Sequence, residues 1–472
     1  MTESSGLPAA SGEYSLRGSL GRYVSGYASL KGNEKSYWTA QVVNLLDQLA
    51  YSATIIVAVV FLSSELGWDD VRAGYGITLF TMGITVSLFF SGIVTDLLGV
   101  RRSLMVSMLL SGITRLVILF CGLSADFPGR DALVLVALCL ASPAVAMSTT
   151  TFQTINKHYS TSQSRGASFS IYFLVVNFAS VVAGLAVDYT RLQLELNNSY
   201  IFGFSAIAFL LAFVVAALFV RDRTLVTDVE NAKGEVAAGV QLALQQVRSV
   251  FSTPTFWWYI LFVSSLLGVR SVFVYAFLIL PKFWIRVLGE DAPIGALYAV
   301  NPAVILIGTL LVIPITHRFR AYPMVLLGST ISALSLIFLA MPHQWFGDDF
   351  QRSFLIMSIL MMVTMSIGEV IWSPKLMQFT AEIAPAGQEG SYFGLSMIPW
   401  FFAKLVVSAL SGHMLARWVP VDVARGIGDG TLAYTDSPEF MFLLLLFWAV
   451  TGPLVLFFFR RILEGKMRAA EQ

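Results

Sequence analysis

The chain has 472 residues, of which 56% are hydrophobic and only 12% are charged. A soluble domain averages roughly 45–50% apolar and about 25% charged residues, so a chain of this composition has too little polar surface to cover itself in water. The formal net charge of +1 also argues against a nucleic-acid-binding protein.

Apolar runs long enough to cross a bilayer recur along the whole chain. A hydrocarbon core about 30 Å thick takes roughly 20 residues of helix. We predict twelve such helices, at residues 38–62, 73–97, 102–123, 131–153, 166–188, 199–220, 255–280, 294–316, 322–341, 353–378, 391–416 and 438–461. The sequence therefore predicts an all-α membrane protein with twelve transmembrane helices in two six-helix halves.

A long polar stretch separates the sixth and seventh predicted helices. We expect a disordered N-terminal tail, a first half, a linker, a second half and a short C-terminal tail, at residues 1–36, 37–220, 221–253, 254–462 and 463–472. Most of the 30 Lys and Arg residues fall on the side that would hold both termini and the linker. Because cytoplasmic loops carry the excess of Lys and Arg, we expect both termini in the cytoplasm and a multi-pass protein in the bilayer of the cell membrane.

The loop after the second predicted helix combines glycine with charged residues at fixed spacing. Gly92, Asp96 and Gly99 are followed by Arg101 and Arg102. Glycine permits a tight reversal of the chain, and a carboxylate beside two cations at the membrane face can lock one packing of helices and release another. This spacing resembles the signature loop of the major facilitator superfamily. The resemblance implies a transporter fold in which the motif takes part in gating.

The tenth predicted helix carries a carboxylate in its middle. Ionisable groups at mid-bilayer are costly, so Glu369 is by default a functional candidate. Pro374 removes a backbone hydrogen bond and provides a hinge. The alternative is that Glu369 only pairs with a neighbouring cation for structural reasons.

Motifs in three predicted helices together resemble a narrower family. Helix ten reads Gly-Glu-x-x-x-Ser-Pro and continues to an Ala-Pro, helix eight contains Asn301 and Pro302, and helix five contains an aromatic and polar run over residues 169–180. These motifs are similar to those of the proton-dependent oligopeptide transporter family, although Ala179 replaces a glycine. The resemblance implies that Glu369 holds an amino group of the substrate.

The first predicted helix departs from that family. Its polar residues Asn44, Asp47, Gln48 and Tyr51 share one helical face. The family motif has a further acid where Asn44 stands and an Arg where Gln48 stands. The architecture thus resembles the peptide transporters, whereas part of their proton and peptide chemistry is missing. A divergent member and a sister family with another substrate both fit.

Four cations lie within the predicted helices, namely Arg115, Arg270, Lys375 and Lys404. Arg115 could snorkel to the outer surface and the two lysines to the cytoplasmic surface, whereas Arg270 is flanked by apolar turns. They outnumber the two carboxylates that we place near mid-bilayer. The surplus of positive charge suits a substrate with a negative group, such as a peptide carboxylate or an organic acid.

Together these patterns define a set of candidate residues. We expect the substrate to contact Asn44, Gln48, Tyr51, Asn177, Arg270, Glu369, Trp372 and Lys404, although Trp372 could equally serve helix packing. Asp47 and Glu369 are expected to carry any proton coupling, with Arg270 close to one acid in only one state of the protein. No segment resembles a phosphate-binding loop, a metal site or a nucleophile–base pair. We therefore expect no enzyme, no catalytic residue, no metal and no cofactor.

The leading hypothesis is a secondary transporter that works by alternating access and couples protons to the uptake of small peptides or a related small polar organic solute. An organic-anion carrier or exchanger without proton coupling is the alternative, which the missing Arg of the first helix favours. A transport-inactive receptor with the same fold is less consistent with charges kept near the membrane midplane. We expect no nucleic-acid partner.

Overall fold

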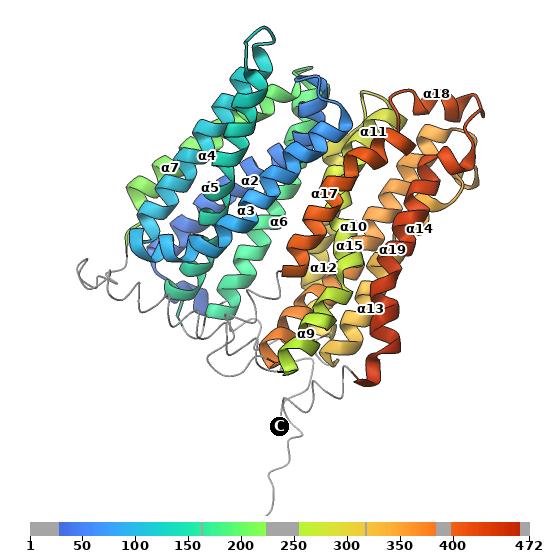
Figure 1. Ribbon diagram of the computed structural model, residues 1–472. Coiled ribbons are helices and arrows are strands. Elements are labelled where there is room, and N and C mark those ends of the chain that lie inside the picture. Colours follow the sequence, from blue (N-terminus) through green and yellow to red (C-terminus); the bar gives the residue numbers. More distant parts are fainter. Residues whose placement is uncertain (1–27, 162–163, 223–253, 317–318, 384–397, 463–472) are drawn as a thin grey trace, which may run out of the picture.

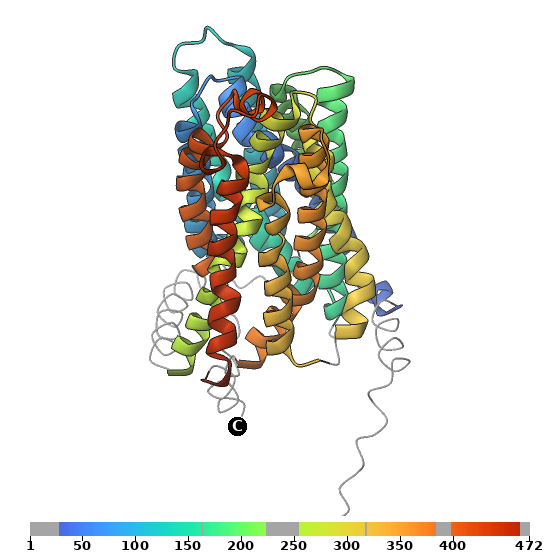
Figure 2. The ribbon, with the colours of Figure 1, turned by 90° about the vertical axis from the view of Figure 1, so that its right-hand side faces the viewer.

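The computed structural model describes residues 28–161, 164–222, 254–316, 319–383 and 398–462. Within these residues the regular elements are helices, and none is a strand. Two helical bundles stand side by side (Figure 1), and the view in Figure 2 shows that the long helices of each run roughly parallel. In Figure 1 the helices from α2 to α7 lie on the left and those from α9 to α19 on the right. The expected all-α fold in two halves is therefore confirmed.

The first bundle has one long helix for each span predicted within residues 38–220. These helices are α2 (Lys35–Ser64), α3 (Asp70–Leu98), α4 (Val100–Leu123), α5 (Arg130–His158), α6 (Arg165–Asp188) and α7 (Asn198–Phe219). Local chemistry sets several of their ends. The Asp69 side chain accepts a hydrogen bond from the Arg72 amide at the start of α3, and Asn197 caps α7 in a similar way.

The second bundle contains more, and shorter, helices than predicted. They are α9 (Pro254–Ser265), α10 (Leu267–Leu278), α11 (Leu280–Leu288), α12 (Ile294–Thr316), α13 (Ala321–Leu334), α14 (Ile337–Ala340), α15 (Phe350–Ile383), α17 (Ile398–Trp418), α18 (Val423–Gly428) and α19 (Pro438–Phe458). The predicted helix 255–280 is split into α9 and α10, which are bent by 44°. The predicted start of the eleventh span at residue 391 lies outside the described residues.

The described helices agree with a protein that crosses the membrane many times. Ten of them are long and apolar enough to span a bilayer, or eleven if the bent pair α9 and α10 forms one span. α17 is a further long helix, of 21 residues, at the place of the eleventh predicted span. Each predicted span thus has a helical counterpart in the described part of the chain.

Two helix pairs join the bundles closely. Where α6 packs on α12, Gly184 faces Gly295, and a Cβ on either residue would overlap the carbonyl oxygen of the other. Where α3 packs on α17, a Cβ on Gly412 would overlap the α3 backbone. Asp188 strengthens the first pair, because its carboxylate accepts hydrogen bonds from the amides of Gly295 at 2.8 Å and Ala296 at 2.7 Å. A carboxylate at a helix N-terminus also meets the favourable end of the helix dipole.

A partly buried ion cluster ties the bundles together at the upper end of Figure 1, beside α11. Asp70, at the start of α3, accepts hydrogen bonds from Lys282 at 2.7 Å and from two nitrogens of Arg286 at 2.8 Å each. Lys282 also donates to the Ser63 hydroxyl, and Arg286 donates to the Val419 carbonyl. The three charged side chains are only 4–13% exposed. Separation of the bundles at this end would therefore leave charges without their partners.

Candidate functional site

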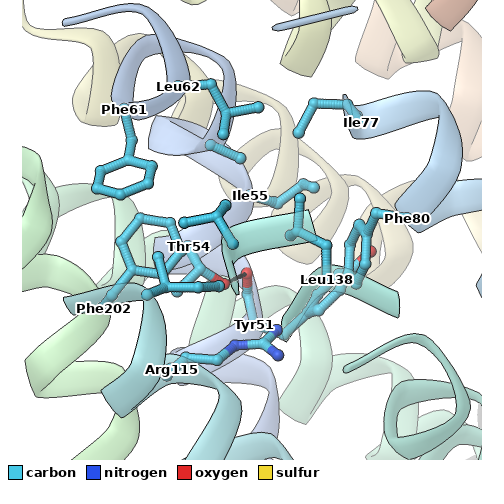
Figure 3. Close-up of a pocket in the computed structure, with 13 residues that line it drawn as sticks. Tyr51, Thr54, Ile55, Phe61, Leu62, Ile77, Phe80, Arg115, Leu138 and Phe202 are labelled. Atoms are coloured by element: carbon cyan, nitrogen blue, oxygen red, sulfur yellow. Dashed lines mark hydrogen bonds between the residues drawn. The ribbon is translucent and has the colours of Figure 1, made fainter. Parts of the chain in front are cut away.

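A carboxylate and an arginine lie close together inside the first bundle. Asp47, in the middle of α2, is 4% exposed and accepts a hydrogen bond from Gln48 at 3.0 Å. Arg115, on α4, interacts electrostatically with both Asp47 and Tyr51. In Figure 3 its guanidinium reaches under the Tyr51 side chain. The polar face predicted for α2 is thus completed by a cation from a different helix.

Arg115 itself is buried, with 3% of its surface exposed. Of the two positions that the sequence left open, the structure therefore shows the buried one and not the snorkelling one. The guanidinium lies 5.2 Å from the centre of the Phe209 ring and donates a long hydrogen bond, of 3.3 Å, to the Thr114 hydroxyl. Sequence reasoning did not count Arg115 among the site residues, since nothing in its own helix marks it as inward-facing.

The second bundle contains a corresponding group of polar residues around Glu369 on α15. Asn301, on α12, donates to the Glu369 carboxylate at 3.1 Å and to the Ser366 hydroxyl at 2.9 Å. Arg270, on α10, is 8% exposed and interacts electrostatically with Glu369. Three helices therefore meet at this acid, and two of its neighbours come from motifs that the sequence singled out.

Trp372 forms part of the wall behind Arg270. The Arg270 guanidinium lies 5.5 Å from the centre of the Trp372 ring, within the range of a cation–π interaction. The ring nitrogen donates to the Ser332 hydroxyl at 3.2 Å, and Trp372 is 3% exposed. It is thus packed in place and presents a ring face to the cation. Lys404 on α17 adds a further positive charge that interacts with Arg270.

Tyr298, on α12, connects the two groups. It interacts electrostatically with Tyr51 of the first bundle and with Glu369 of the second. The sequence prediction missed this residue, although Tyr298 precedes Asn301 by one helical turn and therefore shares its face. Tyr51 and Glu369, which belong to different bundles, therefore both act on Tyr298.

Two predicted site residues, Asn44 and Asn177, form hydrogen bonds with residues one helical turn away and not with the acids of the site. Asn44 is fully buried and donates a long hydrogen bond, of 3.5 Å, to Gln41, which in turn donates to Asn156 of α5 at 3.0 Å. Asn177 is 7% exposed and donates to the Phe173 carbonyl one turn earlier in α6 at 2.9 Å. Neither amide makes a described contact with the acids of the site.

The predicted gating loop forms a tight turn at the lower end of Figure 1. Gly99 has a φ of 79°, a conformation that favours glycine, and a Cβ there would press on the Asp222 carboxylate. Asp222 accepts a hydrogen bond from the Arg101 amide at 2.8 Å. Arg102 is exposed, and a Cβ on Gly92 would meet only the Thr150 side chain, at 4.0 Å. The side chain of Asp96 is not among the described parts of the chain. Asp222 is the partner that the motif itself did not reveal.

Solved structures with the same fold are transporters. The chain aligns with a peptide transporter in complex with sulfate at 18% identity and a TM-score of 0.68, over 92% of this chain and 96% of the other. It aligns with a structure from a study of proton-dependent oligopeptide transporters at 16% identity and a TM-score of 0.67, over 92% and 99%. It aligns with a D-xylose–proton symporter at 14% identity and a TM-score of 0.66, over 89% of this chain and 96% of the other. At such identities the likeness shows the fold alone.

The sequence also matches a family model, although no curated protein sequence matches it. The match is to the Major Facilitator Superfamily and extends over residues 42–408, which include helices of both bundles. Family match, helix arrangement and solved relatives agree. The chain belongs to the major facilitator superfamily of membrane transporters.

Proposed function

We propose that the protein is a secondary transporter that works by alternating access and takes up small peptides, or a related small polar organic solute, together with protons. The observation that carries this proposal is that each half holds an acid and a buried arginine that act on each other electrostatically. Arg115 neighbours Asp47 in the first bundle, and Arg270 neighbours Glu369 in the second. Keeping four charges inside a membrane protein is costly, so a scaffold or a receptor without transport would gain nothing from them.

The arrangement suits a solute that carries charges of both signs. Glu369 is half-buried and offers its carboxylate to an ammonium group, while Asn301 fixes its orientation. Tyr51 and Tyr298 lie between the two groups and supply hydroxyls for a peptide-like backbone. A short peptide could therefore contact both halves at once, and the halves could close around it.

Alternating access requires that contacts at one end of the bundles break while those at the other end form. The contacts at the upper end are suited to this, since they are polar or depend on close glycine packing. The Asp70 cluster and the Asp188 cap on α12 join the bundles through hydrogen bonds that water can replace when the bundles separate. We propose that these residues form the outer gate and that the loop with Gly99 and Arg101 belongs to the inner gate.

Proton coupling is assigned to the two buried acids. Asp47 and Glu369 each have an arginine nearby, so a movement that separates acid from cation would favour uptake of a proton. The sequence suggested that Arg270 comes close to one acid in only one state, and because an arginine acts on each acid, the same alternation can occur in both halves. The alternative function is an organic-anion carrier or exchanger without proton coupling. The excess of cations favours it, since Lys404 adds to the positive charge around Arg270.

We also propose that the protein lies in the cell membrane, with both termini and the linker 221–253 in the cytoplasm. The two halves are proposed to comprise residues 37–220 and 254–462, as expected from the sequence. Single cysteines at Ser4, Gly234 and Gln472 test the orientation. A membrane-impermeant thiol reagent should label none of them in intact cells and all of them after lysis. Labelling of any one in intact cells would contradict the arrangement.

Uptake into proteoliposomes tests the function itself. Labelled di- and tripeptides and labelled organic acids should be compared with and without an inward proton gradient. Peptide uptake that the gradient accelerates supports the proposal. Uptake of organic acids alone, indifferent to the gradient, supports the anion carrier instead.

A further inference from the structure

A narrow pocket lies inside the first bundle, behind Tyr51. Side chains of α2, α3, α4, α5 and α7 line it, among them Ile55, Phe80 and Phe202 (Figure 3). Of the described residues around it, only Arg115 is charged. The free volume of about 20 Å³ is slightly more than one water molecule needs. The pocket can thus take one small group but not a whole solute.

The charge of Arg115 is poorly neutralised. No carboxylate in the described part of the chain lies within salt-bridge distance of it, and Asp47 acts on it only through the electric field. Its Nε is buried and has no hydrogen-bond acceptor among the described residues. A buried guanidinium in such surroundings is unfavourable unless an anion completes them.

The neighbouring side chains restrict what that anion can be. The Tyr51 side chain also lines the pocket, and its hydroxyl can donate a hydrogen bond to an anion. Thr54 also lines the pocket, but its hydroxyl donates to backbone carbonyls of its own helix. The other lining residues are apolar and would leave a second negative charge without a partner. A single negative charge on a compact group therefore fits, whereas a phosphate or a sulfate does not.

We propose that this pocket binds a monovalent anionic group between the Arg115 guanidinium and the Tyr51 hydroxyl. The group is either a free halide-sized ion or the carboxylate of a transported solute. The inference deepens the transport function proposed above, because Tyr51 also interacts with Tyr298 of the other half. An anion behind Tyr51 would hold this tyrosine in place at the interface. Gln48 stands where the resembled family has an Arg, and with Arg115 binding the anion no cation is needed at residue 48.

Thermal unfolding of the purified full-length protein tests the site at constant ionic strength. The sodium salt of a bulky sulfonate buffer is replaced stepwise by chloride or bromide in one arm, and by acetate or propionate in the other. In the wild type, at least one arm should raise the unfolding midpoint in a saturable manner. Arg115→Gln should weaken the apparent affinity by about tenfold or more, the effect of losing a charged hydrogen bond. Arg352→Gln removes an exposed cation of α15 as a matched control and should respond as the wild type does.

The arms also identify the source of the anion. A response to halides alone assigns the site to a free ion, and a response to carboxylates alone assigns it to the solute. No response in either arm, or an equal response in wild type and Arg115→Gln, overturns the inference. Should Arg115→Gln fail to fold, Arg115→Lys and Tyr51→Phe decide, since an unchanged affinity in both would also overturn it. Transport without an anion response refutes only this site, and an anion response without transport refutes only the proposed function.

Discussion

Replacement of Glu369 by Gln tests the central acid of the second bundle. The change keeps the size of the side chain and an oxygen that can accept the hydrogen bond of Asn301, now 3.1 Å from the carboxylate. It removes the negative charge that faces Arg270 and, as we propose, the ammonium group of the solute. The fold should therefore survive while binding is impaired.

The expected magnitude follows from the interaction that is lost. A hydrogen bond to a charged group contributes about 1.5–3 kcal/mol, which corresponds to a roughly 10- to 150-fold weaker affinity. Binding of a peptide to purified protein can be measured by calorimetry or by competition with a labelled peptide. Unfolding midpoints of both proteins show whether the variant is intact.

Glu290→Gln is the matched control, because Glu290 is exposed in the loop before α12. It should bind the solute as the wild type does. An affinity of Glu369→Gln within about twofold of the wild type, in a folded protein, would refute the proposed contact with the solute. Equal losses in both variants would point to a general effect of charge on the protein.

Three further changes test the upper end of the bundles. Asp70→Asn should cost about 1–3 kcal/mol of unfolding free energy, measured by denaturant titration, because Lys282 and Arg286 keep only a neutral partner; an unchanged stability would show that the cluster is replaceable. Gly295→Ala should lower both thermal stability and transport rate because its Cβ overlaps α6, whereas a Cβ on Gly428 in α18 meets only Phe350 at 3.6 Å, so Gly428→Ala should not. Burial raises the pKa of Glu65 from 4.5 to about 7, so the folded state binds this proton more tightly and stability should fall as pH rises from 4.5 to 7. Glu65→Gln should lose that part of the pH dependence, and an unaltered slope would contradict the assignment.

The positions of the helices could be predicted because hydropathy and length are local properties. A run of apolar residues must form its backbone hydrogen bonds within itself in a bilayer, so every predicted span became a helix. Two intervals, 255–280 and 322–341, are each divided between two helices. In the first of them α9 and α10 meet at a 44° bend. No proline marks that place, and Gly268 contacts the α19 backbone there instead. Such a bend results from packing between distant segments, which local patterns do not contain.

The candidate site was predicted only in part, for the same physical reason. Periodicity placed Asp47 and Tyr51 on one face of α2, and the cost of a buried charge singled out Glu369. These local patterns could not show which cation lies near which acid, because the cations come from other helices, Arg115 from α4 and Arg270 from α10. Tyr298 was missed because a tyrosine in an apolar helix gives no signal of its own.

Gradient-driven uptake combined with counterflow is the most direct test of proton-coupled peptide transport by this protein. Proteoliposomes with wild type or Asp47→Asn are given a labelled peptide, either with an imposed inward proton gradient or with unlabelled peptide trapped inside. We expect that the wild type accumulates peptide under the gradient, and that Asp47→Asn loses this accumulation but keeps the exchange of label, which needs no net proton movement. Peptide uptake by the wild type that is indifferent to the gradient, or accumulation by Asp47→Asn equal to that of the wild type, would contradict it.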